Sequence, residues 1–118
     1  MSKMYGPHGE ALFKPQLVDE KIGVSVDADA DIFDEDLEAP DDGFWIIKIA
    51  TDTAGYPKVK ETPAGSDTSR TAALNEKANL TTDSEYEFLW TAHKGDAINI
   101  QFSASAKVTV RVFFVRSL

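Results

Sequence analysis

A chain of 118 residues with 42% hydrophobic content and no cysteine is long enough for one domain, held together by packing rather than by disulfides. Its net charge of −8 disfavours nucleic acid as a direct partner, because phosphate binding needs clustered Lys and Arg. No apolar run approaches the ~20 residues that span a bilayer, so we expect no membrane partner. The first residues also lack the apolar stretch of a secretory signal.

Residues 1–16 predict an irregular N-terminal arm. They contain Gly6, Pro7, Gly9 and Pro15 and show little periodicity. The remaining residues, 17–118, are expected to form a single β-sandwich domain.

From Leu17 the pattern changes to a period of two, which is typical of a strand with one buried face. The apolar residues of this run alternate with small or acidic ones; they are Ile22, Val24, Val26, Ala28, Ala30 and Ile32. Aspartate is a poor strand former, so the second half of this run is expected to fray into a loop. Residues 34–43 are acidic, contain Pro40 and predict a loop.

Residues 44–50 are apolar on both faces and predict a central strand. Residues 56–62 predict a further strand, which Pro57 restricts to a sheet edge. Residues 69–79 have helix-favouring content and predict at most one short helix.

Three alternating runs fill the last third of the chain, at residues 85–92, 98–103 and 108–115. Short polar connections separate them, one of them the turn at His93–Asp96, and this spacing predicts an antiparallel meander. With the earlier strands the chain is expected to be all-β, with about six to eight strands in an antiparallel sandwich or jelly-roll-like fold.

Charge is unevenly distributed along the chain. Residues 19–42 hold eleven of the twenty acids and one base, Lys21, whereas residues 97–118 hold three bases and no acid. The acidic segment and the basic final hairpin can therefore attract each other, within one molecule or between copies.

The acidic segment also contains the one candidate cation site, formed by Asp27, Asp29 and Asp31. Together with Glu38 they have the carboxylate spacing of an EF-hand loop, but Ile32 stands where that loop needs glycine, and a strand pattern precedes it. Three interpretations stay open: a solvated acidic edge, a protein contact, or a Ca²⁺ site of another kind. No other cofactor is expected.

No catalytic motif is visible in the sequence. The two histidines, His8 and His93, have no zinc-binding context, and no serine near His93 and Asp96 carries a nucleophile motif. We therefore expect a protein that is not an enzyme.

Strands that are apolar on both faces have more apolar side chains than a single core can bury. The surplus side chains indicate a contact surface. Phe113 and Val115 lie on the face opposite Val112 and Phe114, and Phe44 belongs to the other doubly apolar run. The interface candidates are these three, three arm residues and two bases: Phe44, Phe113, Val115, Tyr5, Leu12, Phe13, Arg111 and Arg116.

In size and layout the chain resembles the small accessory proteins, decoration or cement, of virus and phage heads. These are β domains with extended N-terminal arms that clamp capsid subunits. The resemblance covers the chain in outline and rests on no specific motif, so it assigns no residue roles. It implies a non-enzymatic structural protein of the virion that binds itself, with a trimer as one option, and a larger assembly such as a capsid. The alternative is a β-sandwich module that binds carbohydrate or calcium, with a cytoplasmic location.

Overall fold

The computed structural model describes residues 14–117, so the predicted contacts of Tyr5, Leu12 and Phe13 lie outside the described residues. Eight strands and one short 3₁₀ segment follow one another: β1 (Gln16–Val26), β2 (Leu37–Glu38), β3 (Gly43–Thr51), β4 (Pro57–Thr62), β5 (Arg70–Ala73), η1 (Asn75–Lys77), β6 (Tyr86–Ala92), β7 (Ala97–Phe102) and β8 (Ala106–Arg116).

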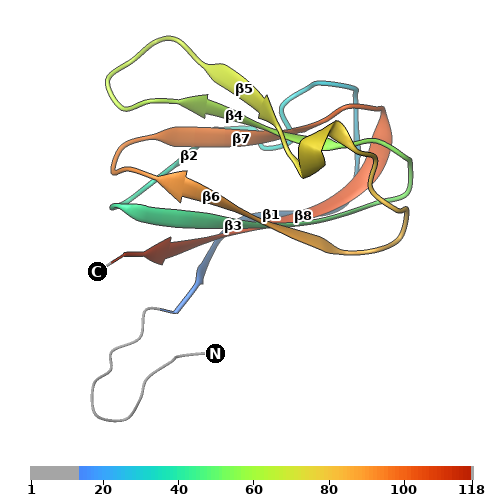
Figure 1. Cartoon of the computed structure of the whole chain (residues 1–118), viewed down its shortest axis with the longest axis horizontal. Coiled ribbons are helices and arrows are strands. Elements are labelled where there is room, and N and C mark those ends of the chain that lie inside the picture. Colours follow the sequence, from blue (N-terminus) through green and yellow to red (C-terminus); the bar gives the residue numbers. More distant parts are fainter. Residues whose placement is uncertain (1–13, 118) are drawn as a thin grey trace.

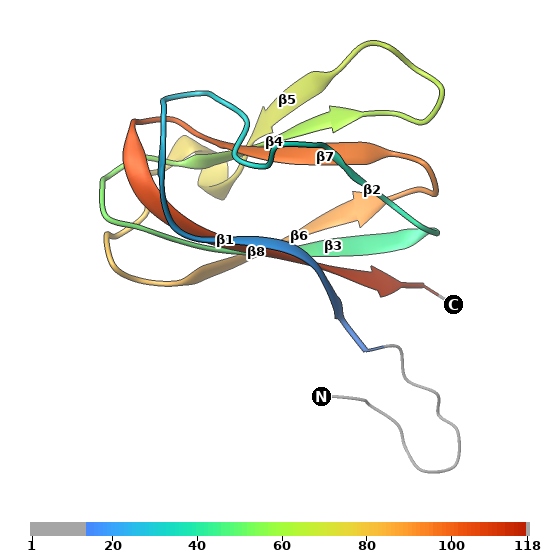
Figure 2. The same cartoon turned by 180° about the vertical axis from the view of Figure 1, so that it is seen from behind.

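The strands form two packed four-stranded sheets (Figures 1 and 2). We call the lower sheet in both figures the front sheet, with the order β1-β8-β3-β6, and the upper one the back sheet, with the order β2-β7-β4-β5; all the pairings are antiparallel. The chain passes repeatedly from one sheet to the other, as in a double-sheet jelly roll. The predicted all-β, jelly-roll-like sandwich is confirmed.

β3 and β8 occupy the middle of the front sheet. The central position predicted for residues 44–50 is therefore confirmed. A middle strand has a strand on each side, so its outward side chains as well as its inward ones are shielded by neighbours. The inward side chains of β3 and β8 are almost wholly buried, among them Trp45, Ile47, Val110 and Val112.

The predicted meander of the last third is wrong. β6 pairs with β3, β7 pairs with β2 and β4, and β8 pairs with β1 and β3, so the final basic strands do not form a hairpin. Packed sheets lie ≈ 10 Å apart, and a four-residue turn such as His93–Asp96 can cross that gap as easily as it closes a hairpin. The alternation of apolar and polar residues along a strand therefore does not determine which strand pairs with it.

The edge position predicted for residues 56–62 is also wrong, because β4 lies between β7 and β5. Pro57 is the first residue of β4, a place where a missing N–H is tolerated, and its carbonyl accepts a bond from the Leu74 amide at 2.9 Å. The edge is formed by β5, which takes four residues of the segment expected to favour a helix. Only the 3₁₀ segment Asn75–Lys77 follows it, with positive φ angles of 53, 53 and 63°.

β1 ends at Val26, and Asp27, Asp29 and Asp31 lie in the loop that follows, as their poor strand propensity predicts. The expected burial of alternate residues is wrong at Ile22, which is 59% exposed, whereas Val24 and Val26 pack against the core. Two register shifts against β8 and a positive φ of 60° at Gly23 interrupt the alternation there.

The core lies between the two sheets. Trp45 meets Phe114 edge to face with ring centroids 5.2 Å apart, and Ile98, Ile100 and Phe102 approach from β7. Each fully buried aliphatic or aromatic side chain contributes about 1.5–3 kcal/mol relative to an exposed one. Phe33 of the acidic segment joins this core at 1% exposure.

Asn99 on β7 connects the acidic segment to the back sheet. Its side chain accepts a bond from the Phe33 amide and donates one to the Phe33 carbonyl, both at 3.0 Å, and donates another to Asp36 at 2.9 Å. Because Asn99 is only 1% exposed, water cannot replace these partners without rearrangement.

We predict that Asn99→Ala lowers the free energy of unfolding by about 2–3 kcal/mol, since it leaves buried backbone groups of Phe33 unpaired. Urea denaturation measures the change. Asn79→Ala, at an exposed loop position, is the control and should stay within ~0.5 kcal/mol of the wild type. Equal free energies of unfolding for the two variants would contradict this role of Asn99.

Candidate functional site

An apolar row crosses the outer face of the front sheet. The strand registers place Leu17 of β1 opposite Phe113 of β8, Phe113 opposite Ile46 of β3, and Ile46 opposite Leu89 of β6. Directly opposite residues of antiparallel strands share a face with Cβ atoms ≈ 4.5–5.5 Å apart, so the four side chains adjoin. Leu17 is 50% exposed and Leu89 is 62% exposed.

Two further apolar side chains widen the row. Phe44 of β3 lies opposite Val115 of β8, two residues along from Ile46 and Phe113 and therefore on the same face. Scattered surface leucines need no explanation, but contiguous apolar side chains in register over four strands mark a surface that favours a partner.

A row of charged side chains lies next to the apolar row, on the side away from Phe44 and Val115. Glu20, Arg111, Lys48 and Glu87 lie opposite one another from β1 to β6. Arg111 Nε is 3.1 Å from the Glu20 carboxylate, and Lys48 Nζ is 3.7 Å from that of Glu87. These exposed pairs contribute at most about 1 kcal/mol each, but they leave this band of a strongly acidic chain neutral.

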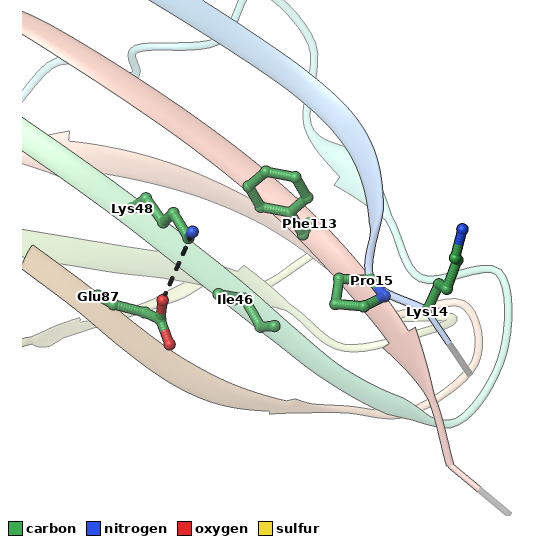
Figure 3. Close-up of a pocket in the computed structure, with 6 residues that line it drawn as sticks. All are labelled: Lys14, Pro15, Ile46, Lys48, Glu87 and Phe113. Carbon is green, nitrogen blue, oxygen red and sulfur yellow. Dashed lines mark ion pairs between the residues drawn. The ribbon is translucent and has the colours of Figure 1, made fainter. Parts of the chain in front are cut away.

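A shallow hollow of ≈ 450 Å³ opens where the two rows meet (Figure 3). Phe113 and Ile46 form its apolar floor, Lys48 and Glu87 form one side, and Pro15 with Lys14 form the other. Lys48 Nζ lies 5.4 Å from the centroid of the Phe113 ring, close enough for a cation–π contact. The hollow is therefore amphipathic.

Four of the interface candidates gather on this face: Phe44, Phe113, Val115 and Arg111. Arg116 lies at the end of β8 and is 3.8 Å from Asp41. The sequence interpretation missed Ile46, Leu17 and Leu89. Alternation alone could have found Ile46, because it shares the parity of Phe44, whereas the register that aligns Leu17 and Leu89 with it is not visible in the sequence.

The acidic segment lies against the back sheet. The Asp29 amide donates to the Phe102 carbonyl at 2.7 Å and the Ile32 amide donates to that of Ile100 at 2.9 Å, so the segment follows β7. The expected attraction to the C-terminal bases exists only in part, as Arg111 with Glu20 and Arg116 with Asp41.

Two lysines of β4 are the main partners of the candidate cation ligands. Lys58 pairs with Asp29, and Lys60 pairs with Asp31 at 2.6 Å and with Asp36 at 3.8 Å. Within residues 14–117, no three His, Cys, Asp or Glu side chains are grouped so as to hold a metal ion. Lysine ammoniums thus lie where a cation would have to bind.

Asp31 has the most perturbed environment of the three. Burial raises the pKa of Asp31, but hydrogen bonds from Gln101 and Lys60, with the charge of Lys60, outweigh burial and hold that pKa below its usual value. The hydrogen bond to Asp31 in turn raises the pKa of Lys60. Each charged form is therefore favoured by the other.

The turn His93–Asp96 has a structural task. The Asp96 carboxylate accepts bonds from the Ala64 amide at 2.9 Å and from the His93 amide at 3.2 Å, which ties the connection after β4 to the turn before β7. The His93 ring is largely exposed, with Nδ1 3.6 Å from Asp96.

None of the described helical segments is long and apolar enough to cross a membrane.

The lowered pKa of Asp31 predicts a pH dependence. A carboxyl group whose pKa is lower in the folded state stabilises the fold above its unfolded pKa and loses that contribution as pH falls through the lowered value. We expect Asp31→Asn to cost about 1 kcal/mol or less at neutral pH and a smaller amount near pH ~2. Urea denaturation at both pH values tests this. Asp67→Asn, in an exposed loop, should parallel the wild type, and a constant difference for Asp31→Asn would contradict the assignment.

The lysine pairs also predict a weak response to calcium. Excess CaCl₂ should move the thermal midpoint by less than about 1 °C relative to EGTA, because a ligand stabilises only as far as it binds the folded state. A saturable rise in the midpoint that Asp29→Asn or Asp31→Asn abolishes would instead establish a calcium site.

No family model and no curated protein matches the chain. Among solved structures, it is similar to the C-terminal domain of A223, a structural protein from Sulfolobus turreted icosahedral virus. The two share 16% sequence identity with a TM-score of 0.51, and the similarity covers 89% of this chain and 100% of that one. At this identity the likeness shows a common fold.

Proposed function

We propose that the chain is a non-enzymatic structural protein of a virion, a capsid decoration or cement protein. It acts through self-association and through an N-terminal arm that includes Tyr5, Leu12 and Phe13. The outer face of the front sheet is its contact surface with the larger assembly. Its location is the virion.

The apolar row carries this proposal. Its members come from all four strands of the front sheet, and its two ends are half or more exposed. An apolar band beside a charge-balanced row suits a protein partner, because the apolar side chains gain from burial while the charged row sets orientation.

The likeness to a viral structural domain supports the same assignment. The matched domain belongs to a protein described as structural, and the similarity spans that whole domain. Fold alone does not carry function, so the likeness adds to the surface argument and does not replace it.

The alternative, a carbohydrate- or calcium-binding module, finds less support. Asp29 and Asp31 are paired with lysines, and Trp45 and Phe102 are fully buried. Tyr86, Phe88 and Trp90 pack partly against the core, and Trp90 Nε1 donates to Glu61 at 3.2 Å. These rings stabilise the sandwich.

The test is association with particles. The chain should co-sediment with gradient-purified virions of its source, and recombinant wild-type protein should rebind particles stripped of it. Phe113→Glu should weaken rebinding by roughly tenfold or more, because it places a carboxylate at the centre of the apolar row.

Thr71→Glu, an exposed change on β5 of the back sheet, is the matched control and should bind like the wild type. Circular dichroism checks that both variants keep the fold. Rebinding of Phe113→Glu at wild-type affinity, or absence of the chain from purified particles, would refute the proposal.

A further inference from the structure

The two sheets have four edges, and three of them are protected against pairing with another chain. β1 has two register shifts and the positive φ of Gly23, β2 has two residues, and β5 has four residues. Bulges and shortness are two of the devices by which natural sheets prevent edge-to-edge association.

β6 is the exception. Its seven residues follow β3 one for one without a register shift, and they include no proline, glycine or lysine. β6 ends the front sheet, nearest the viewer in Figure 1 and farthest in Figure 2, and pairs only with β3 among the described strands. An edge of this kind is a template for an added strand.

We infer that β6 pairs antiparallel with β6 of a second copy about a two-fold axis at Leu89, which joins two front sheets into one of eight strands. This inference rests on the self-association in the proposed function, and it names the edge, the symmetry and the register.

Face alternation restricts the register. If outward side chains are to meet outward side chains, the axis must pass through a residue rather than between two, because a one-residue slip reverses the faces. Glu87, Leu89 and Thr91 point outward and are exposed, whereas Phe88 and Trp90 pack against the core side.

Among such registers, the one centred on Leu89 is favoured by polarity and charge. It sets Leu89 beside its own copy, so the two apolar rows become one continuous row of eight side chains across both subunits. It sets Glu87 opposite Thr91 of the second copy, so no like charges meet. A centre at Glu87 would oppose two carboxylates, and a centre at Phe88 would set Glu87 against Leu89.

There is room on the inner side of the strand. A hollow of ≈ 640 Å³ lies beside β6, lined by Leu89, Trp90 and Thr91 together with Glu61, Pro63 and Ala64. In the Leu89 register Phe88 of the second copy lies opposite Trp90, where this hollow can accept it. Aromatic cross-strand pairs are among the favourable ones.

The chain has no cysteine, which makes cross-linking a direct test. Leu89→Cys places two thiols opposite each other on the axis, at a separation that a disulfide can bridge. We expect copper–phenanthroline to convert this variant to a covalent dimer. Thr71→Cys, on the protected edge β5, is the control and should form no covalent dimer at the same concentration. Failure of Leu89→Cys to cross-link above this control would overturn the inference.

Charge at residue 91 tests the register in solution. Thr91→Lys creates two Glu87–Lys pairs across the axis and should tighten the dimer, whereas Thr91→Glu creates two repulsive pairs and should loosen it. The dissociation constant from sedimentation equilibrium should move on the order of tenfold in opposite directions. The same changes at Thr71 should leave it unaltered.

A trimer, a wild-type monomer at all concentrations, or equal effects of the two charges at residue 91 would each refute this pairing. Particle binding gives a separate readout. A strictly monomeric protein that still rebinds particles through Phe113 would refute the β6 pairing and leave the attachment surface intact. A dimer that never associates with particles would refute the attachment surface and leave the β6 pairing intact.

Discussion

The pairing of β3 with β8 in the middle of the front sheet is the constraint on which the rest depends. Nine successive residue pairs, from Gly43–Arg116 to Thr51–Val108, keep one register. This register directs Trp45 and Phe114 into the core, where their rings meet at 5.2 Å, and it directs Phe113 and Ile46 outward. A slip of one residue would exchange the two faces, so the core and the apolar row are two consequences of the same alignment.

The front and back sheets of the sandwich differ in how the acidic side chains are distributed. The acidic segment follows β7, Asn99 holds Phe33 there, and Lys58 and Lys60 neutralise two of its carboxylates. Much of the acidic excess is therefore placed at the back sheet. The outer face of the front sheet has no comparable acidic excess, because Glu20 and Glu87 are paired with Arg111 and Lys48 within one row. A partner approaching the front meets apolar side chains and little net charge, which favours association of a protein with a net charge of −8.

Edge protection and surface composition point to the same strand. β1, β2 and β5 are interrupted or short, whereas β6 is regular and carries at its middle the exposed Leu89, which belongs to the apolar row. Edge pairing and face contact need not compete, because the added strand bonds along the backbone of β6 and the face remains open. A row lengthened by a second copy offers a larger apolar surface to an assembly than either copy offers alone.

Local pattern was enough to predict the all-β class, the central strand at residues 44–50, the strand at residues 108–115, the end of β1 near the aspartates, and four of the side chains on the front face. Each of these depends on the period of two, which every strand carries in its own residues. The meander and the edge position of Pro57 were wrong, and Leu17 and Leu89 were missed, for a common reason. Which strand lies beside which, and in what register, is decided by pairings between residues as far apart as 17 and 113. Only the folded chain brings those residues together, because alternation is equally compatible with a neighbour in either sheet.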